Sequence, residues 1–274
     1  MTEDPSSAQA ELVEAEAYES MMQLAESAGI PGFRAVRSGT HVALIAPGLK
    51  KMLVFNRVLR LGVSGPATEA HIDELAALYA EHDLPWAIEL SPHARPESVL
   101  QWLRDRRIRR GAASAVLMRA SSDVPEGKSD LEIRPWRPED EDAGAALAVD
   151  AFSVPQEAKA LLAELPRSPK WRQWLALDDG TVVATGLLYL GDGVAWAGWE
   201  ATRPDYRGRG LHGALISACL RDASLHGCTS VITDTAVGTP DRPDPSYQNH
   251  LRKGFEVLHL RHTYLAVPGV VAPA

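Results

Sequence analysis

The chain has 274 residues, of which 45% are hydrophobic and 23% charged, and its formal net charge is −8 at pH 7. This composition is typical of a folded globular protein, and the length suffices for two domains that each bury a core. The negative charge argues against general binding of nucleic acid or of an anionic membrane, because both depend on clustered positive charge.

The N-terminus and the cysteines set further limits. Met1–Ser7 is acidic and polar, unlike a secretory signal, and no apolar run is long enough to span a bilayer, so we expect a cytoplasmic protein. Cys219 and Cys228 are the two cysteines, and they indicate neither a disulfide framework nor a cysteine-based zinc site. His226 and His262 have no metal-ligand spacing, and we expect no metal.

The first half of the chain alternates predicted helices and strands. Hydrophobic periodicity predicts an amphipathic helix over 8–28, a second over 68–81 that Thr68 caps, and a short one over 97–106. Apolar runs predict strands at 42–45, 52–55, 56–62, 86–90 and 112–118, the first two as a hairpin. We therefore expect a small α/β domain over 1–122.

A polar, turn-rich linker at 123–130 separates this domain from a second one over 131–274. Strands are predicted at 131–136, 171–177, 181–189, 193–201, 229–234, 255–260 and 263–267. Helices are predicted at 138–152, 211–225 and 246–253, with an irregular region between 153 and 170. Asp178-Asp179-Gly180 predicts a tight turn between the second and third of these strands.

A glycine- and arginine-rich stretch, Arg203–Gly213, lies between the strand at 193–201 and the helix at 211–225. The start of a helix presents free N–H groups and partial positive charge, and glycine lets a phosphate approach the backbone closely. The stretch therefore predicts a site for a phosphate-bearing ligand.

The same glycines, Gly208, Gly210 and Gly213, have the spacing of a dinucleotide-binding fingerprint, and Asp234 stands where a ribose-binding acid would. However, the polar segment 202–207 separates the strand from the first glycine, and too little chain follows for the remaining strands of such a domain. A dinucleotide site is the weaker interpretation.

Arg207-Gly-Arg-Gly-Leu-His212 resembles the Arg/Gln-x-x-Gly-x-Gly/Ala signature of the GNAT family of acyl-CoA-dependent N-acetyltransferases. The resemblance covers about 131–267, since 131–142, the turn at 178–180 and Gly254-Phe255 look like the family's first strand and helix, its hairpin and the end of its last helix. His212 departs from the pattern by filling a position for a small residue, and its ring would crowd a pyrophosphate unless it turns aside. The first domain looks like the degenerate N-terminal half of tandem GNAT proteins, with an unrelated α/β domain as the alternative.

The resemblance implies an α/β (α+β) chain of two GNAT-like domains, each a mixed, mostly antiparallel sheet flanked by helices. It also implies acetyl-CoA, or another acyl-CoA, as co-substrate and a small-molecule or peptide amine as acceptor, and it leaves a homodimer open. The residues expected at the cofactor are Ala201, Thr202, Arg203, Arg207, Gly208, Arg209, Gly210, Leu211, His212, Gly213 and Asn249.

Three residues are candidates for proton transfer. Glu200 ends an apolar strand just before the proposed cofactor contacts and is the candidate base, with a plain ion pair to Arg203 or another cation as the alternative. His250 stands where much of the family has a proton-donating tyrosine, and Tyr247 lies one helical turn earlier, so the donor is one of these two. A catalytically silent acyl-CoA-binding protein of the same fold is the alternative function. Tryptophans 171, 174, 196 and 199 either line an acceptor pocket or belong to the core.

Overall fold

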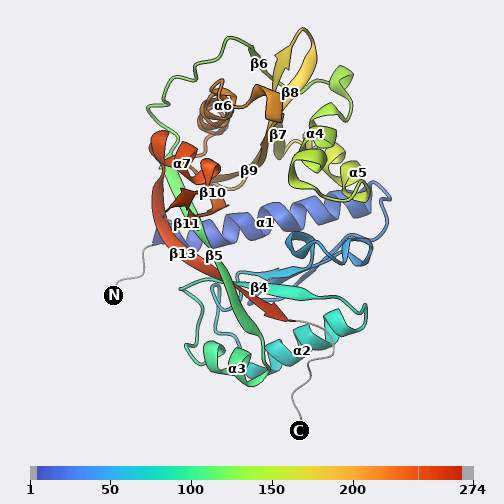
Figure 1. Cartoon of the computed structure of the whole chain (residues 1–274). Coiled ribbons are helices and arrows are strands. Elements are labelled where there is room, and N and C mark those ends of the chain that lie inside the picture. The colour runs from blue at the N-terminus through green and yellow to red at the C-terminus, as the bar shows by residue number, and fades with distance from the viewer. Residues whose placement is uncertain (1–4, 240, 267–274) are drawn as a thin grey trace. The chain divides into compact units, whose positions relative to one another are not determined.

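A computed structural model describes residues 5–239 and 241–266 of the chain (Figure 1). It divides into two compact units: unit 1 comprises the described residues up to Ser114 and those from His259 onward, and unit 2 comprises Ala115–Leu258. The predicted linker at 123–130 thus lies inside unit 2. Val267, the last residue of the final predicted strand, and the outer ends of the two predicted domains lie outside the described residues.

Unit 1 is a mixed sheet with three α-helices, in agreement with the predicted alternation. The helices are α1 (Pro5–Ser27), α2 (Glu69–Ala80) and α3 (Val99–Asp105). The sheet has the order β1 (Arg34–Arg37), β2 (Val42–Ile45), β3 (Arg57–Leu59), β4 (Trp86–Leu90), β13 (Glu256–Ala266) and β5 (Arg109–Ala120). Strands β3 and β4 are parallel, whereas β1–β2, β2–β3 and β4–β13 are antiparallel.

The predicted strand at 52–55 is wrong. This segment forms the 3₁₀ turns η1 (Pro47–Leu49) and η2 (Leu53–Phe55). The buried Asn56 amide explains the difference: its Oδ1 accepts from the N–H of Ala46 at 2.8 Å, and its Nδ2 donates to the carbonyl of Leu49 at 2.9 Å. A side chain that satisfies the backbone in this way replaces the ladder of a strand.

Unit 2 carries the second half of the fold. Its helices are α4 (Ala143–Phe152), α5 (Glu157–Glu164), α6 (Leu211–Leu225) and α7 (Pro245–Arg252), with 3₁₀ turns η3 (Pro138–Asp140), η4 (Leu165–Arg167) and η5 (Pro204–Tyr206). Its strands are β6 (Glu132–Pro135), β7 (Trp171–Asp178), β8 (Thr181–Leu190), β9 (Val194–Thr202) and β10 (Ser230–Ala236), with a short pair β11 (Gly238–Thr239) and β12 (Arg242–Pro243). The order β5-β10-β9-β8-β7-β6 is antiparallel from β9 to β6 and parallel between β9 and β10.

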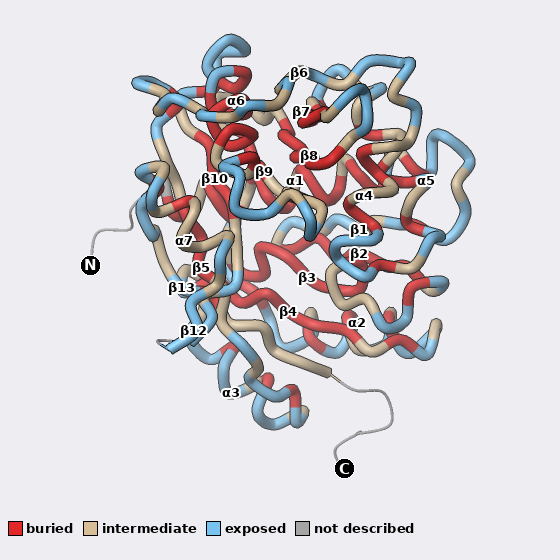
Figure 2. The backbone as a smooth tube through the Cα atoms, turned by 45° about the horizontal axis from the view of Figure 1, so that its top comes forward, coloured by how far each residue is buried: buried red, intermediate tan, exposed pale blue. Residues whose placement is uncertain are grey.

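Helices cover both faces of this sheet. Helices α4 and α5 lie on one side of β7–β9 and α6 on the other (Figure 1). Seven consecutive residues of β8 are buried, and the buried stretches of β8, β9 and α6 form the core of the unit (Figure 2). Trp171 and Trp196 are fully buried in edge-to-face contact, with their ring centres 6.3 Å apart, so these two tryptophans belong to the core.

Three further expectations are corrected in this half. The predicted helix over 138–152 is interrupted, because Glu141 adopts φ +48° between η3 and α4. The predicted irregular region contains α5, and the two predicted strands at 255–260 and 263–267 form one continuous strand, β13. The predicted turn is confirmed: Asp179 and Gly180 adopt φ +47° and +79° between β7 and β8, as a two-residue hairpin requires.

The fold class expected from the sequence is confirmed: both units have mixed, mostly antiparallel strands with flanking helices. None of the described helices has the length and apolar character needed to span a bilayer.

Candidate active site

The predicted phosphate loop connects β9 to α6. Gly208 and Gly210 adopt φ +80° and +79°, a region that is open to glycine and disfavoured for other residues. Gly210 is the N-cap of α6, so no side chain caps the helix, and the first turn contains no acidic residue. The N–H groups at the start of α6 therefore lack a side-chain acceptor, as expected at an anion site.

Packing adds a second reason for two of the glycines. A Cβ on Gly210 would lie 2.9 Å from the carbonyl oxygen of Lys128, and one on Gly213 would lie 2.9 Å from Cε of Lys253. The Lys253 ammonium is itself fixed, because it donates to the carbonyl of Glu126 at 2.8 Å and to Ser217 Oγ at 3.0 Å. The segment predicted as a linker thus packs against the start of α6.

Two of the three arginines in the loop are already paired. Arg203 binds Asp205 at 2.8 Å, and Arg209 binds Asp130 at 2.5 Å. Both guanidinium groups lie over the ring of Tyr206, 5.2 Å from its centre. Arg207 is exposed and forms no ion pair with any described residue. It is the cation of the loop most available to a phosphate.

A bulge near the end of β9 positions Glu200. The ladder with β8 pairs Thr185 with Ala201 and Leu187 with Gly198, so that Trp199 and Glu200 together lie opposite Gly186. Trp199 adopts φ +54° at this point. A Cβ on Gly186 would come within 3.4 Å of Glu200 Cγ, so the glycine leaves room for the carboxylate.

The parallel ladder between β9 and β10 is shorter than the strands themselves. It joins Ser230–Ile232 to Val194–Trp196, although β9 continues to Thr202 and β10 to Ala236. The backbone of β9 past Trp196 is therefore not paired with β10. Among the predicted cofactor contacts, Ala201 and Thr202 pair with β8, and the N–H of Arg203 donates to Val183 at 2.9 Å, so this N–H is not free for a cofactor.

Glu200, His212 and His250 form a cluster that we call the Glu–His–His centre. Glu200 Oε2 lies 2.9 Å from His212 Nε2 and 3.3 Å from His250 Nε2. The side chains of Glu200 and His250 are 5% and 1% exposed, and that of His212 is 18% exposed. Glu200 does not pair with Arg203, which pairs with Asp205; its partners are the two histidines, so the alternative of a carboxylate that only pairs with another cation stays a prediction.

The Glu–His–His centre shows how the His212 ring is accommodated at a position where the GNAT signature has a small residue. Its ring turns aside toward Glu200, and its Nδ1 lies 2.7 Å from Nδ2 of Asn249 on α7. Since Asn249 Oδ1 accepts from Arg252, its Nδ2 is the donor to His212, and His212 Nε2–H then donates to Glu200. The predicted cofactor residue Asn249 thus supports His212.

The charges of the centre stabilise each other. Burial favours a neutral Glu200, but the attraction of His250 and His212 and the hydrogen bond of His212 outweigh it and lower the pKa of the carboxyl group. Burial likewise favours a neutral His250, but the Glu200 carboxylate and the carbonyl of Ser246, 2.9 Å from Nδ1, raise the pKa of the ring. The two shifts have opposite directions, so the carboxylate form of Glu200 and the protonated form of His250 favour each other.

Helix α7 supplies the remaining candidates. Asp244 caps it by accepting from the N–H groups of Ser246 and Tyr247, and Pro245 occupies its first turn. His250 points to Glu200, whereas Tyr247 packs against the apolar cluster around α6. Ser246, whose carbonyl orients His250, was not predicted; the Asp-Pro pair that begins the helix could have located it.

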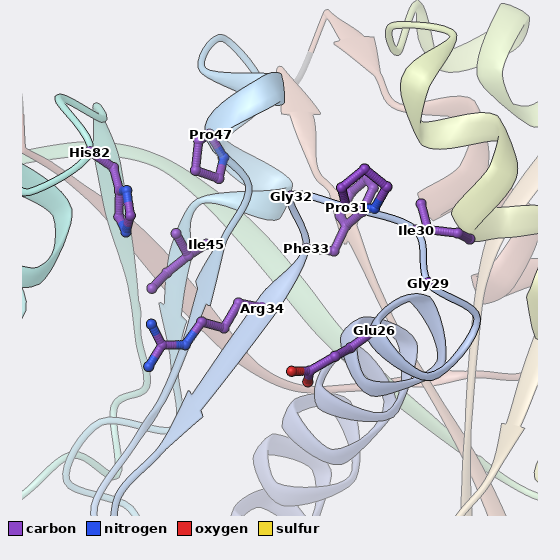
Figure 3. Close-up of a pocket in the computed structure, with 10 residues that line it drawn as sticks. All are labelled: Glu26, Gly29, Ile30, Pro31, Gly32, Phe33, Arg34, Ile45, Pro47 and His82. Carbon is purple, nitrogen blue, oxygen red and sulfur yellow. The ribbon is translucent and has the colours of Figure 1, made fainter.

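A separate cavity of about 430 Å³ lies in unit 1, at the end of α1 (Figure 3). Apolar side chains such as Ile30, Phe33 and Ile45 line it, with Glu26, Arg34 and His82 among the polar ones. None of the predicted site residues contributes to it. The candidate chemistry is at the start of α6 and not in this cavity.

The chain resembles known acetyltransferases in sequence and in fold. Residues 134–243 match the Acetyltransferase (GNAT) family. The structure is similar to a GCN5-related N-acetyltransferase from Kribbella flavida, with 19% identity, a TM-score of 0.65 and 95% of each chain covered. A tandem GNAT protein from the clavulanic acid biosynthesis pathway gives 17% identity and a TM-score of 0.60 over 99% of this chain and 97% of the other.

A GCN5-related N-acetyltransferase from Sphaerobacter thermophilus gives 17% identity and a TM-score of 0.58 over 99% of this chain and 95% of the other. No curated protein sequence matches the chain. The resemblance to tandem GNAT proteins expected from the sequence is confirmed: residues 134–243 match the Acetyltransferase (GNAT) family, within a chain that has the fold of GCN5-related N-acetyltransferases.

Proposed function

We propose that the protein transfers an acetyl or other acyl group from acyl-CoA to a primary amine, by direct attack of the amine on the thioester. The observation that carries this proposal is the uncapped start of α6 beside the Glu–His–His centre, inside a GNAT-family domain. The acceptor is a small-molecule or peptide amine.

In this proposal the loop between β9 and α6 binds the pyrophosphate of the cofactor. The N–H groups from Arg209 to Gly213 and the partial positive charge of the helix face the phosphates, and the free guanidinium of Arg207 adds a cation. The edge of β9 that faces away from β8 has no β10 partner past Trp196 and is available to the pantetheine arm. The glycines keep side chains away from the phosphate oxygens.

The proton chemistry follows from the balance of the reaction. The amine nitrogen forms a bond to the carbonyl carbon, the C–S bond breaks, and the sulfur leaves with the electron pair. A lysine-like amine has a pKa of about 10.4 and must first lose a proton to become a nucleophile. A second proton leaves the nitrogen as the amide forms, and one proton must reach the thiolate.

We assign these transfers to the Glu–His–His centre. His250 is the proton donor to the leaving thiolate, because the Glu200 carboxylate keeps it protonated. Glu200 has a lowered pKa and is a weak base, so its role is to hold the two rings and to stabilise positive charge on them. His212 is the most exposed member, and we assign it as the acceptor of the amine's proton at Nδ1, in exchange for the hydrogen bond from Asn249.

A catalytically silent acyl-CoA-binding protein is the second candidate. It is favoured by the ion pairs that occupy Arg203 and Arg209 and by the near-complete burial of His250. Calorimetry with acetyl-CoA, combined with thiol release across a panel of amines, separates the two. Binding with turnover of at least one amine supports the transferase; binding without turnover of any amine supports the silent protein; absence of binding contradicts both.

A further inference from the structure

The hydrogen bonds within the Glu–His–His centre do not satisfy all of its buried polar atoms. Glu200 Oε1 and His250 Nε2 are buried and have no hydrogen-bond partner among the described residues. His250 Nε2 points to the carboxylate at 3.3 Å, but the contact does not have the geometry of a hydrogen bond. Buried polar atoms without a partner destabilise a fold, so a positive group bound to these two atoms would stabilise the centre.

We propose that this centre binds a divalent transition-metal ion of the zinc type through Glu200, His212 and His250. One ligand atom from each residue lies within 4.8 Å of the others. Ligands about 2.0–2.1 Å from a tetrahedral Zn²⁺ are separated by about 3.4 Å, so the observed 2.9 and 3.3 Å need only a small adjustment.

The hydrogen bonds around the centre favour the same atoms as ligands. A metal-bound imidazole usually donates its second N–H to a carbonyl or carboxylate, which fixes the ring and directs the other nitrogen to the metal. His250 does so through Nδ1, which lies 2.9 Å from the carbonyl of Ser246. For His212 the matching acceptor would be Asn249 Oδ1, which requires the amide to rotate and to give up the hydrogen bond that Oδ1 accepts from Arg252. Both Nε2 atoms then point to the metal.

The donor set also defines the class of ion. Two imidazoles and one carboxylate suit Zn²⁺, Co²⁺, Ni²⁺ and Cu²⁺, whereas Mg²⁺ and Ca²⁺ prefer oxygen ligands. Cys219 is buried and does not belong to the cluster, so no thiolate contributes. With three protein ligands the fourth position of a tetrahedral ion is open to water.

Metal binding would compete with the proton on His250, since the same Nε2 lone pair holds either one. The metal would therefore inhibit acyl transfer by occupying the groups that move protons. This consequence rests on the proposed function, whereas metal binding itself does not.

The test uses the full chain without a purification tag, stripped of metal by a chelator and dialysed. Zn²⁺ is titrated by calorimetry, and Co²⁺ by its visible absorption, which reports the coordination number. We expect one ion per chain and the intense absorption of a four-coordinate Co²⁺ site. His212→Gln should weaken binding by more than about 100-fold, beyond what the loss of an outer hydrogen bond costs.

His226→Gln is the matched control, because His226 is an exposed histidine of the same unit that pairs with Asp222 outside the centre. It should bind Zn²⁺ like the wild type. Absence of stoichiometric binding, or equal affinity of His212→Gln and wild type, would overturn the proposal. Stoichiometric Zn²⁺ binding by a protein whose metal-free form transfers no acyl group supports the metal site and contradicts the transferase, so the two failures are distinguishable.

Discussion

The starts of α2 and α6 occupy the same place in their units, since each follows the first strand of a parallel pair, β3–β4 or β9–β10. At α2 two side chains of the first turn accept from the free N–H groups. Thr68 Oγ1 accepts from the N–H of His71, and His71 Nδ1 accepts from the N–H of Thr68 at 3.1 Å. At α6 a glycine stands in the same position and leaves the N–H groups uncapped. A helix start that has its own side-chain acceptor offers fewer free N–H groups to an anion than one without it.

The histidines beside the two helix starts differ in the direction in which their surroundings shift the pKa. Near α2, burial and then the charges of His71 and Arg60 lower the pKa of His41 to about 4, so this ring is neutral. Near α6, Glu200 raises the pKa of His250 and keeps it charged. Unit 2 thus combines the uncapped helix start that we propose as the phosphate site with the histidine that we propose as the proton donor, and the described residues of unit 1 offer neither at the corresponding place.

Blocking the proposed phosphate site at the start of α6 should have the largest effect, a loss of acetyl-CoA affinity. Gly210→Val places a branched side chain at φ +79°, beside the phosphate path and 2.9 Å from the Lys128 carbonyl. We expect acetyl-CoA binding to fall by more than about 100-fold, because the main phosphate contacts are lost. Isothermal calorimetry measures the change.

Gly180→Val is the control for backbone strain. Gly180 has the same φ of +79°, but a Cβ there meets no atom within 4 Å, and the residue lies in the hairpin turn between β7 and β8. It should lower thermal stability and leave CoA affinity unchanged. If Gly210→Val bound acetyl-CoA as tightly as Gly180→Val does, the anion site would lie elsewhere.

Removing the proton donor should have the next largest effect. His250→Gln should lower kcat by about 10²-fold or more, the usual contribution of a general acid, whereas Tyr247→Phe should have little effect. Since His250 is buried, thermal unfolding and CoA affinity must be measured on the same variant to separate catalysis from folding. The reverse ranking of the two variants would identify Tyr247 as the donor.

The pH dependence tests the same assignment. A raised pKa means that His250 is protonated below its ordinary pKa of 6.5 and loses the proton only as the pH rises through the raised value. The rate should therefore increase with pH as the amine deprotonates, and then fall. The falling limb should be absent in His250→Gln, and a falling limb that persists there would assign it to another group.

The closed start of α2 should affect stability and not binding. Thr68→Ala removes the side-chain acceptor and should lower the free energy of unfolding by about 1 kcal/mol, as measured by chemical denaturation. Thr181→Ala, at the exposed start of β8, is a control and should change it little. CoA affinity should remain that of the wild type in both variants; a change in affinity with Thr68→Ala would show that unit 1 contributes to the site.

Local signals predicted the elements that define the site. The glycines of the loop, the Asp-Asp-Gly turn and the Thr68 cap each act over a few residues, and the structure has them where the sequence places them. The prediction of a strand at 52–55 was wrong because the buried Asn56 amide forms hydrogen bonds with backbone groups seven and ten residues away. Hydrophobic periodicity does not reveal these bonds. Contacts distant in sequence decided that segment.

The sequence likewise did not reveal which residues form the Glu–His–His centre. His212 was expected to crowd a phosphate, and only the packing of α7 beside α6 shows that its ring has partners in Glu200 and Asn249. Glu11 on α1 gives a parallel case: helical periodicity says nothing of the buried ion pair that it forms with Arg261, about 250 residues later, at 3.0 Å. Charges that find partners across the fold cannot be placed from local patterns.

The smallest predicted effect concerns the segment that packs against the start of α6. Asp130 holds Arg209 in an exposed ion pair, and both residues lie at the loop where the phosphates of CoA would bind. Asp130→Asn should release the guanidinium for the ligand and tighten CoA binding by about two- to fivefold at low salt, with the gain lost at high salt because exposed charges are screened.

Asp83→Asn, which breaks the exposed pair with Lys50 in unit 1, changes the net charge equally and is the control. Its CoA affinity should match the wild type, which separates release of Arg209 from a general reduction of negative charge. Equal gains in both variants would show that only net charge matters. Weaker binding in Asp130→Asn would show that the ion pair positions Arg209 for the phosphate, so that the acidic segment belongs to the binding site instead of competing with its ligand.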